Sequence, residues 1–127
     1  MKNPIAWLEI PTKDINRASD FYNFIFNWKI QAMDIGELKM AVFPGDNNGK
    51  GGWGALVQHE KAYAVSENNQ GALPYFSTDD IDKTLQKIQE AGGEILLPKT
   101  MISEENGYMA LFRDSEGNRM ALHSKND

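Results

Sequence analysis

An internal repeat limits the folds that this chain can adopt. Three short stretches recur in the same order, each copy lying 66 or 69 residues after the first. They are 12–17 with 78–83, 40–43 with 109–112, and 54–57 with 120–123. Matches that keep one order and nearly one spacing indicate a duplicated unit, and two copies are too few for a solenoid. We therefore expect two similar modules packed on each other.

Each copy has the pattern of one helix among four strands. In the first, Ala6, Leu8 and Ile10 alternate with Ile5, Trp7 and Glu9, as in a strand with two distinct faces whose Ala6 face is covered by the helix. Asp14 stands at a helix N-cap before an apolar stripe. The predicted strands of this copy are 4–11, 28–33, 38–43 and 54–57. The second copy repeats the order βαβββ.

Its predicted strands are 72–77, 94–97, 108–112 and 119–123. Asp80 caps the predicted helix of this copy, and Gly92 and Gly93 end it. The expected fold class is α+β, with two tandem βαβββ modules forming a curved mixed sheet around a shared cavity. Module one would span about residues 1–62 and module two about 70–127, within a single domain.

Composition removes several classes of function. The chain has no cysteine, which excludes a disulfide scaffold, a thiolate nucleophile and a cysteine-bound zinc. Its net charge of −5 would repel nucleic acid and anionic membranes, so neither is an expected partner. We expect a cytoplasmic protein, because no window has the length of a membrane span and the first residues lack the apolar core of a signal peptide.

Two motifs resemble those of a known superfamily. They are DINRASDFY at 14–22, at the start of the first helix, and DSEGNR at 114–119, before the last strand. On these motifs and the repeat, the chain resembles the vicinal-oxygen-chelate superfamily, which includes glyoxalase I, bleomycin-resistance proteins and extradiol dioxygenases. The resemblance covers essentially the whole chain. It implies the paired-module fold and, in metal-dependent members, four His or Glu ligands from the first and last strands of each module.

Residue by residue, those four ligand positions carry no ligand here. Counting from the two motifs and the repeat, they fall on Trp7, Ala55, Leu73 and Ala121. None of these side chains has an oxygen or a free nitrogen lone pair for a divalent ion. We therefore expect no cofactor, with a divalent metal as the alternative. A displaced metal site would draw on His59, Glu60, Glu9 and His123.

Residues two places further along these strands would share the same face, which gives Glu9, Val57, Tyr75 and His123. Glu9 and His123 could form a catalytic acid–base pair, with Tyr75 positioning a ligand oxygen. The alternative, which we favour, is that Glu9 pairs with Arg119 or His123 to anchor a ligand in a polar part of the cavity.

The other candidates for the cavity wall are apolar, and most are aromatic, which suits a planar or apolar ligand. Trp53 lies near the end of a glycine-rich segment, 45–54, which we interpret as a hairpin bordering the cavity. For Phe21, Tyr22 and Phe76 we expect ordinary core packing. The predicted ligand-binding residues are Trp7, Glu9, Trp53, Val57, Leu73, Tyr75, Phe112, Arg119 and His123.

Two functions are compatible with these observations. The first, which we favour because the metal ligands are missing, is a protein that binds a small organic molecule in an aromatic-lined cavity without a metal. The second is an enzyme of the lyase, isomerase or dioxygenase class that uses Glu9 and His123 or a displaced metal. Members of the family commonly pair, so we also expect a homodimer.

Overall fold

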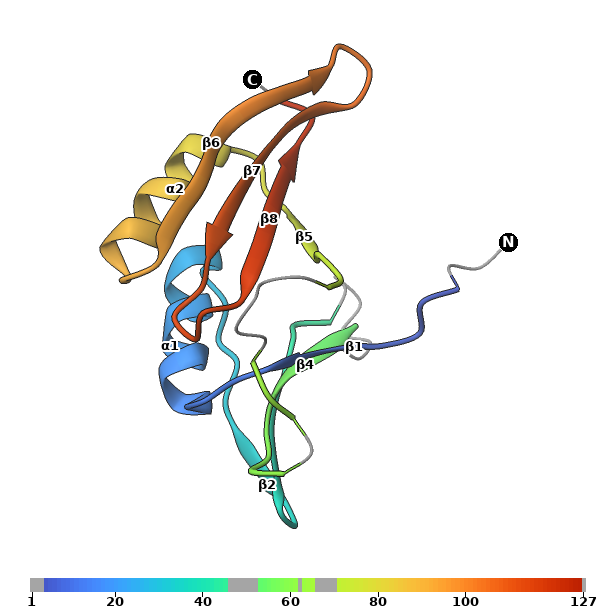
Figure 1. Ribbon diagram of the computed structural model, residues 1–127, viewed down its shortest axis with the longest axis vertical. Coiled ribbons are helices and arrows are strands. Elements are labelled where there is room, and N and C mark those ends of the chain that lie inside the picture. The colour runs from blue at the N-terminus through green and yellow to red at the C-terminus, as the bar shows by residue number, and fades with distance from the viewer. Residues whose placement is uncertain (1–3, 46–52, 62, 66–70, 127) are drawn as a thin grey trace.

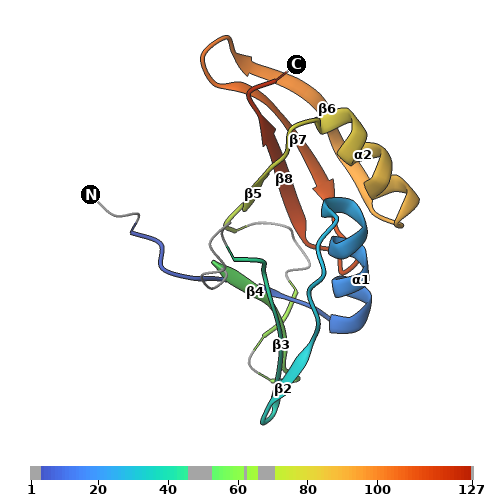
Figure 2. The same cartoon turned by 180° about the vertical axis from the view of Figure 1, so that it is seen from behind.

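The computed structural model describes residues 4–45, 53–61, 63–65 and 71–126. Most of the glycine-rich segment predicted as a hairpin, residues 46–52, lies outside this part of the chain. The described strands form two four-stranded sheets, each mixed parallel and antiparallel. In both views the two helices lie on one side of the sheets (Figures 1 and 2).

The first module contains one helix and a sheet of strand order β1-β4-β3-β2. Parallel pairing joins β1 to β4, and antiparallel pairing joins β4 to β3 and β3 to β2. Its elements are β1 (Leu8–Pro11), α1 (Ile15–Phe26), β2 (Met33–Ile35), β3 (Leu38–Val42) and β4 (Gly54–Gln58).

The second module repeats this topology, with strand order β5-β8-β7-β6 and parallel pairing of β5 with β8. Its elements are β5 (Tyr75–Ser77), α2 (Ile81–Glu90), β6 (Glu94–Ser103), β7 (Gly107–Arg113) and β8 (Arg119–Ser124). The predicted α+β fold of two βαβββ modules is therefore confirmed.

The two helices begin where their caps predict. The Asp14 carboxylate accepts hydrogen bonds from the Asn16 and Arg17 amides, and the Asp80 carboxylate accepts one from the Lys83 amide. These bonds satisfy amides that have no partner within the helix. The helix α1 ends at Asn27, which adopts the left-handed conformation with φ of 57°.

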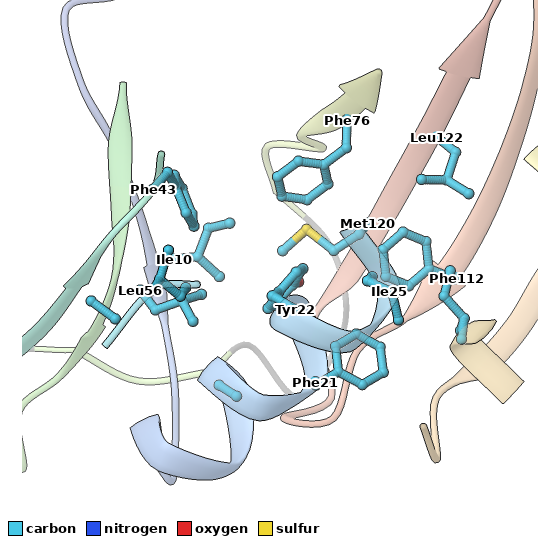
Figure 3. Close-up of a cluster of buried hydrophobic side chains, with 14 of the residues drawn as sticks. Ile10, Phe21, Tyr22, Ile25, Phe43, Leu56, Phe76, Phe112, Met120 and Leu122 are labelled. Atoms are coloured by element: carbon cyan, nitrogen blue, oxygen red, sulfur yellow. The ribbon is translucent and has the colours of Figure 1, made fainter. Parts of the chain in front are cut away.

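One hydrophobic core crosses from module to module, with α1 in the middle (Figure 3). Tyr22 and Phe21 lie between the side chains of the first sheet, such as Phe43, and those of the second, such as Phe112. Phe21 stacks on Phe112 at 6.4 Å between ring centroids. The predicted core packing of Phe21, Tyr22 and Phe76 is confirmed, since all three are at most 4 % exposed. The packing of α1 therefore stabilises both modules.

Four details differ from the sequence predictions. The first strand begins at Leu8 instead of residue 4, and Ala6 is exposed because it precedes the part of the chain that α1 covers. The strand β6 is longer than predicted, because three register shifts let it continue along β7 to Ser103. Third, the second strand was predicted at 28–33, but β2 spans Met33–Ile35, where it pairs with β3. Fourth, the described strand pairs form two separate sheets and not one continuous sheet.

No helix among the described residues is both long enough and apolar enough to cross a membrane.

Candidate functional site

A groove of about 750 Å³ lies where the two modules meet. One side is aromatic and comes mainly from the first module, while the other side is β5 and the first turns of α2. Two of the predicted ligand-binding residues, Trp53 and Tyr75, lie in it, one from each module. The lining residues are Ile25, Phe26, Asn27, Trp28, Trp53, Tyr75, Phe76, Ser77, Thr78, Asp79, Asp80, Lys83, Thr84 and Lys87.

The position of Trp53 is fixed by the strand that follows it. The Trp53 carbonyl accepts a hydrogen bond of 3.2 Å from the Leu8 amide, so the residue is tied to β1. A Cβ on the next residue, Gly54, would lie 2.3 Å from the Leu8 carbonyl oxygen, so only glycine allows this approach. The indole then packs on Phe43, with ring centroids 4.5 Å apart, and on Phe76 at 5.8 Å.

Aromatic surface in this groove remains open to a ligand. The side chains of Trp53 and Tyr75 are 45 % and 51 % exposed. Trp28 approaches Trp53 edge-on, with 6.4 Å between their ring centroids, and it also packs against Phe26. Phe26 and Trp28 were not predicted for this site, since their places in the groove depend on the packing of α1 against Phe76 of β5.

The opposite wall of the groove is polar. Thr78 and Thr84 share a hydrogen bond of 2.8 Å between their hydroxyl oxygens, which ties the end of β5 to α2. Lys83 and Lys87, one turn apart on α2, face the groove together with Asp79 and Asp80. A ligand in the groove would therefore meet rings on one side and both signs of charge on the other.

A second cluster of predicted residues lies on the face of the first sheet that α1 does not cover. The Glu9 carboxylate accepts a hydrogen bond of 3.2 Å from the Trp7 indole N–H and one of 2.5 Å from the Tyr63 hydroxyl. This bond to Glu9 is the largest cause that raises the pKa of Tyr63. Tyr63 follows β4 in a segment without a recognisable pattern, and nothing in the sequence indicated its contact with Glu9.

Strand register supports the equivalence of the four family metal positions. Glu9 pairs with Ala55 in the first sheet, and Tyr75 pairs with Ala121 in the second. Ala55 and Ala121 thus occupy equivalent positions in the two sheets. Trp7 and Leu73 are equivalent in the same way, because each lies two residues before the strand partner of one of these alanines. The side chains at these four positions do not fit the family's metal. Within the described ranges, no three His, Asp or Glu residues group closely enough to hold a metal ion.

The predicted partnership of Glu9 with His123 or Arg119 is not found among the described hydrogen bonds and ion pairs. His123 instead bonds through Nε2 to the Asn106 carbonyl oxygen at 2.7 Å, beside the turn between β6 and β7. Arg119, at the start of β8, pairs in register with Arg113. His59 was proposed for a displaced metal site, and its Nε2 atom lies 3.6 Å from Oε2 of Glu37. The structure thus gives the acid–base hypothesis no supporting contact.

Two predicted ligand contacts fall on fully buried side chains. Phe112 belongs to the central core, because its place in β7 turns it toward α1 and not toward the uncovered face of the sheet. Val57 lies on the face of the first sheet that α1 does not cover, opposite Met40 on the neighbouring strand, but its side chain is fully buried. Leu73 precedes β5 and is half-buried. Phe112 is therefore a correction to the predicted site.

The two motifs that carry the family resemblance bind each other. Glu116 accepts hydrogen bonds from the Arg17 guanidinium at 2.7 and 2.9 Å and from the amides of Lys13 and Asp14. Asp114 accepts a bond of 2.7 Å from the Tyr22 hydroxyl. These contacts join the start of α1 to the turn between β7 and β8, so the motifs hold the two modules together.

The pKa values of these buried groups follow their surroundings. Burial raises the pKa of Asp114, against the opposing effect of its bonds with Tyr22 and Asn118. Burial acts in the same direction on Glu116, but Arg17 and the neighbouring donors outweigh it and hold the pKa of Glu116 below its ordinary value. Burial beside Asp114 raises the pKa of Tyr22 well above its ordinary value.

Comparison with known proteins agrees with this geometry. Residues 4–122 match the profile of the Glyoxalase/Bleomycin resistance protein/Dioxygenase superfamily. The chain belongs to this superfamily. Within the superfamily, it is 31% identical to a glyoxylase-like domain-containing protein of Didymella fabae, with 93% of this chain and 91% of that protein covered. It is 28% identical to the anthracycline biosynthesis protein DnrV of Streptomyces peucetius.

Some of the matched proteins are about twice as long as this chain. The match to DnrV covers 94% of this chain but 46% of that protein. Glyoxalase I from Zea mays superposes with a TM-score of 0.76 at 21% identity, over 96% of this chain and 46% of that one. A glyoxylase/bleomycin resistance protein/dioxygenase domain from Frankia covers 98% of both chains, with a TM-score of 0.71 and 18% identity. The structural likenesses support the fold.

Proposed function

We propose that this superfamily member binds a small organic molecule in the groove between its modules, without the metal of its metal-dependent relatives. One observation carries the proposal: the four family metal positions hold Trp7, Ala55, Leu73 and Ala121, while an open groove rich in aromatic side chains lies at the module junction. A cavity of several hundred Å³ with an apolar wall and a few polar groups is typical of a ligand site.

The chemistry of the groove favours a planar ligand with a polar edge. Trp53 and Tyr75 offer ring surface for stacking, and each stacked ring contributes about 1 kcal/mol beyond the area it buries. Thr78, Lys83 and Lys87 offer hydrogen-bond donors in the same groove. A molecule that satisfies both walls would bind more tightly than one that is only apolar.

The groove is tested with a planar aromatic probe, 1-anilinonaphthalene-8-sulfonate, whose fluorescence rises in an apolar site. We expect saturable binding to the wild type, and an affinity lower by about fivefold or more in Trp53→Ala and in Tyr75→Ala, because each loses one stacked ring. Phe24→Ala is the matched control, since Phe24 is 47 % exposed but lies outside the groove. Equal affinities in all four proteins would contradict the proposal.

The absence of a family-type metal is tested separately by metal analysis. The untagged protein is equilibrated with nickel, zinc, manganese or iron, dialysed, and measured by plasma mass spectrometry. We expect far less than one ion per chain, because the family positions offer no donor atoms. A stoichiometry near one ion per chain or per dimer would overturn this part of the proposal.

Homodimer formation stays a prediction. It is supported by the length of relatives such as DnrV, about twice that of this chain, since two copies of this chain would equal that length. Sedimentation equilibrium distinguishes a mass of 14.3 kDa from twice that value. The monomer mass at micromolar concentration would contradict the prediction.

A further inference from the structure

The cluster of Trp7, Glu9 and Tyr63 has an unusual balance of charge. Both oxygens of the Glu9 carboxylate are occupied, one by the Trp7 indole N–H and one by the Tyr63 hydroxyl. Both donors are neutral. The hydrogen bonds therefore satisfy the carboxylate geometrically while its negative charge stays uncompensated.

No ion pair between residues of the described ranges involves Glu9. Glu9 is half-buried, and its register neighbour Ala55 is fully buried, so the carboxylate lies on a largely apolar part of the sheet. A partly desolvated charge without a counter-charge costs free energy, and a cation that reaches it recovers part of that cost. The site is therefore arranged for a positive partner.

Both donors also bring the rings that recognise organic cations. The faces of tryptophan and tyrosine rings attract an ammonium group through their quadrupole, tryptophan most strongly. Trp7 is 42 % exposed, so a ligand can reach its ring. A carboxylate bordered by two such rings combines charge attraction with cation–π contact.

We propose that Trp7, Glu9 and Tyr63 form a binding site for an organic cation, an amine or a quaternary ammonium group. A divalent metal fits this cluster poorly, because one carboxylate is the only strong ligand among the three side chains and both its oxygens already accept hydrogen bonds. An organic ammonium needs no inner coordination sphere and can lie against the rings.

This site goes beyond the proposed function and does not depend on it. None of its three residues lines the groove between the modules. A single ligand that reached both places would need a cationic group separate from its planar part, but the cation site stands without such a ligand.

The test compares choline with 3,3-dimethylbutan-1-ol, its neutral carbon analogue, at constant ionic strength. Binding is followed by the NMR signal of the Trp7 indole N–H in protein labelled with ¹⁵N-tryptophan, assigned with Trp7→Phe. We expect choline to shift this signal saturably, with an affinity at least about tenfold above that of the neutral analogue. Equal affinities of the two compounds for the wild type would overturn the proposal without any variant.

Two variants and a control sharpen the test. Glu9→Gln keeps the shape of the side chain and removes its charge, so choline affinity should fall by about tenfold or more. Tyr63→Leu removes one ring and should weaken choline binding severalfold. Glu104→Gln removes an exposed carboxylate in the turn after β6 and should leave binding unchanged. Unchanged choline affinity in a folded Glu9→Gln protein would contradict the proposal.

The anilinonaphthalene titration of the groove separates this inference from the proposed function. Glu9→Gln should bind that anionic probe in the groove like the wild type, because Glu9 does not line the groove. If the wild type binds choline no better than the neutral analogue but binds the probe in the groove, the cation site alone is refuted. If the wild type prefers choline but Trp53→Ala and Tyr75→Ala leave probe affinity unchanged, the groove alone is refuted.

Discussion

Glu116, in the turn between β7 and β8, and Glu9, on β1, both accept hydrogen bonds from their own chain, but their carboxylates have different kinds of partner. Glu116 is 2 % exposed and binds a guanidinium, a hydroxyl and two backbone amides. Glu9 is half-buried and binds only an indole and a phenol. The Arg17 guanidinium compensates the charge of Glu116, whereas no ion pair among the described residues compensates that of Glu9.

The difference separates a structural role from a binding role. The hydrogen bonds of Glu116 join residues about a hundred positions apart, so they stabilise the fold. The bonds of Glu9 orient its carboxylate and leave the neighbouring Trp7 ring accessible. A partly buried carboxylate indicates a ligand site only where no positively charged side chain of the same protein pairs with it.

The largest effect should come from Glu116→Ala. This change leaves the Lys13 and Asp14 amides without their acceptor and Arg17 without its carboxylate, so we expect a loss of about 3 kcal/mol in the free energy of unfolding. Urea denaturation followed by circular dichroism measures it. Glu104→Gln is the control and should change stability by less than about 0.5 kcal/mol. A loss as small as the control's would show that Arg17 and the turn do not hold the modules together.

A smaller loss, about 2 kcal/mol, is expected for Tyr22→Phe. The variant keeps the ring in the core and removes the hydroxyl that donates to Asp114, a buried bond to a charged acceptor. The same urea titration measures it. Because Tyr22 and Glu116 act on one turn, the double variant Tyr22→Phe with Glu116→Ala should lose less than the sum of the two single changes. Strict additivity would show two independent anchors.

The pH dependence of stability should come next in size. The pKa of Glu116 is lowered in the folded protein, so its contribution is present above the ordinary value of 4.5 and is lost as the pH falls through the folded value. The raised pKa of Asp114 gives the opposite sign, its contribution being lost as the pH rises. The stability gap between wild type and Glu116→Gln should therefore narrow below pH 4.5. A gap independent of pH would contradict this linkage.

The smallest effect on folding is expected for Glu9→Gln. The amide keeps an oxygen that can accept one of the two bonds, and it removes an uncompensated charge, so stability should change by less than about 0.5 kcal/mol. Thermal unfolding measures it at neutral pH. A loss comparable to that of Tyr22→Phe would assign Glu9 a structural role and make the two glutamates alike.

Most of the fold was predictable from the chain itself because its signals are local. Asp14 and Asp80 cap helices through bonds to amides two or three residues away, and the repeated stretches around 40–43 and 109–112 form equivalent strands, β3 and β7. The strand beginning at Leu8 was predicted too long, because alternation continues in the sequence beyond the point where β4 provides a partner.

The candidate site was predictable only in part. Trp53 was predicted for the cavity from the glycine-rich segment before it, and Tyr75 from its strand position two residues after Leu73. Phe26 and Trp28 join them through the tertiary packing of α1. Phe112 was assigned to the wrong face, since one residue of register decides between core and cavity in a strand. Tyr63 carried no signal at all, because its contact with Glu9 spans 54 residues.

Residue identity and spacing along the chain are enough to predict the duplication, the order of elements, the family resemblance and the lack of metal donors at Trp7, Ala55, Leu73 and Ala121. The folded structure was needed to show that the two family motifs bind each other, that Glu9 contacts Trp7 and Tyr63 and not His123, and that the groove lies beside β5. Such contacts join distant residues, and their geometry depends on how the helices and sheets pack, which no local pattern encodes.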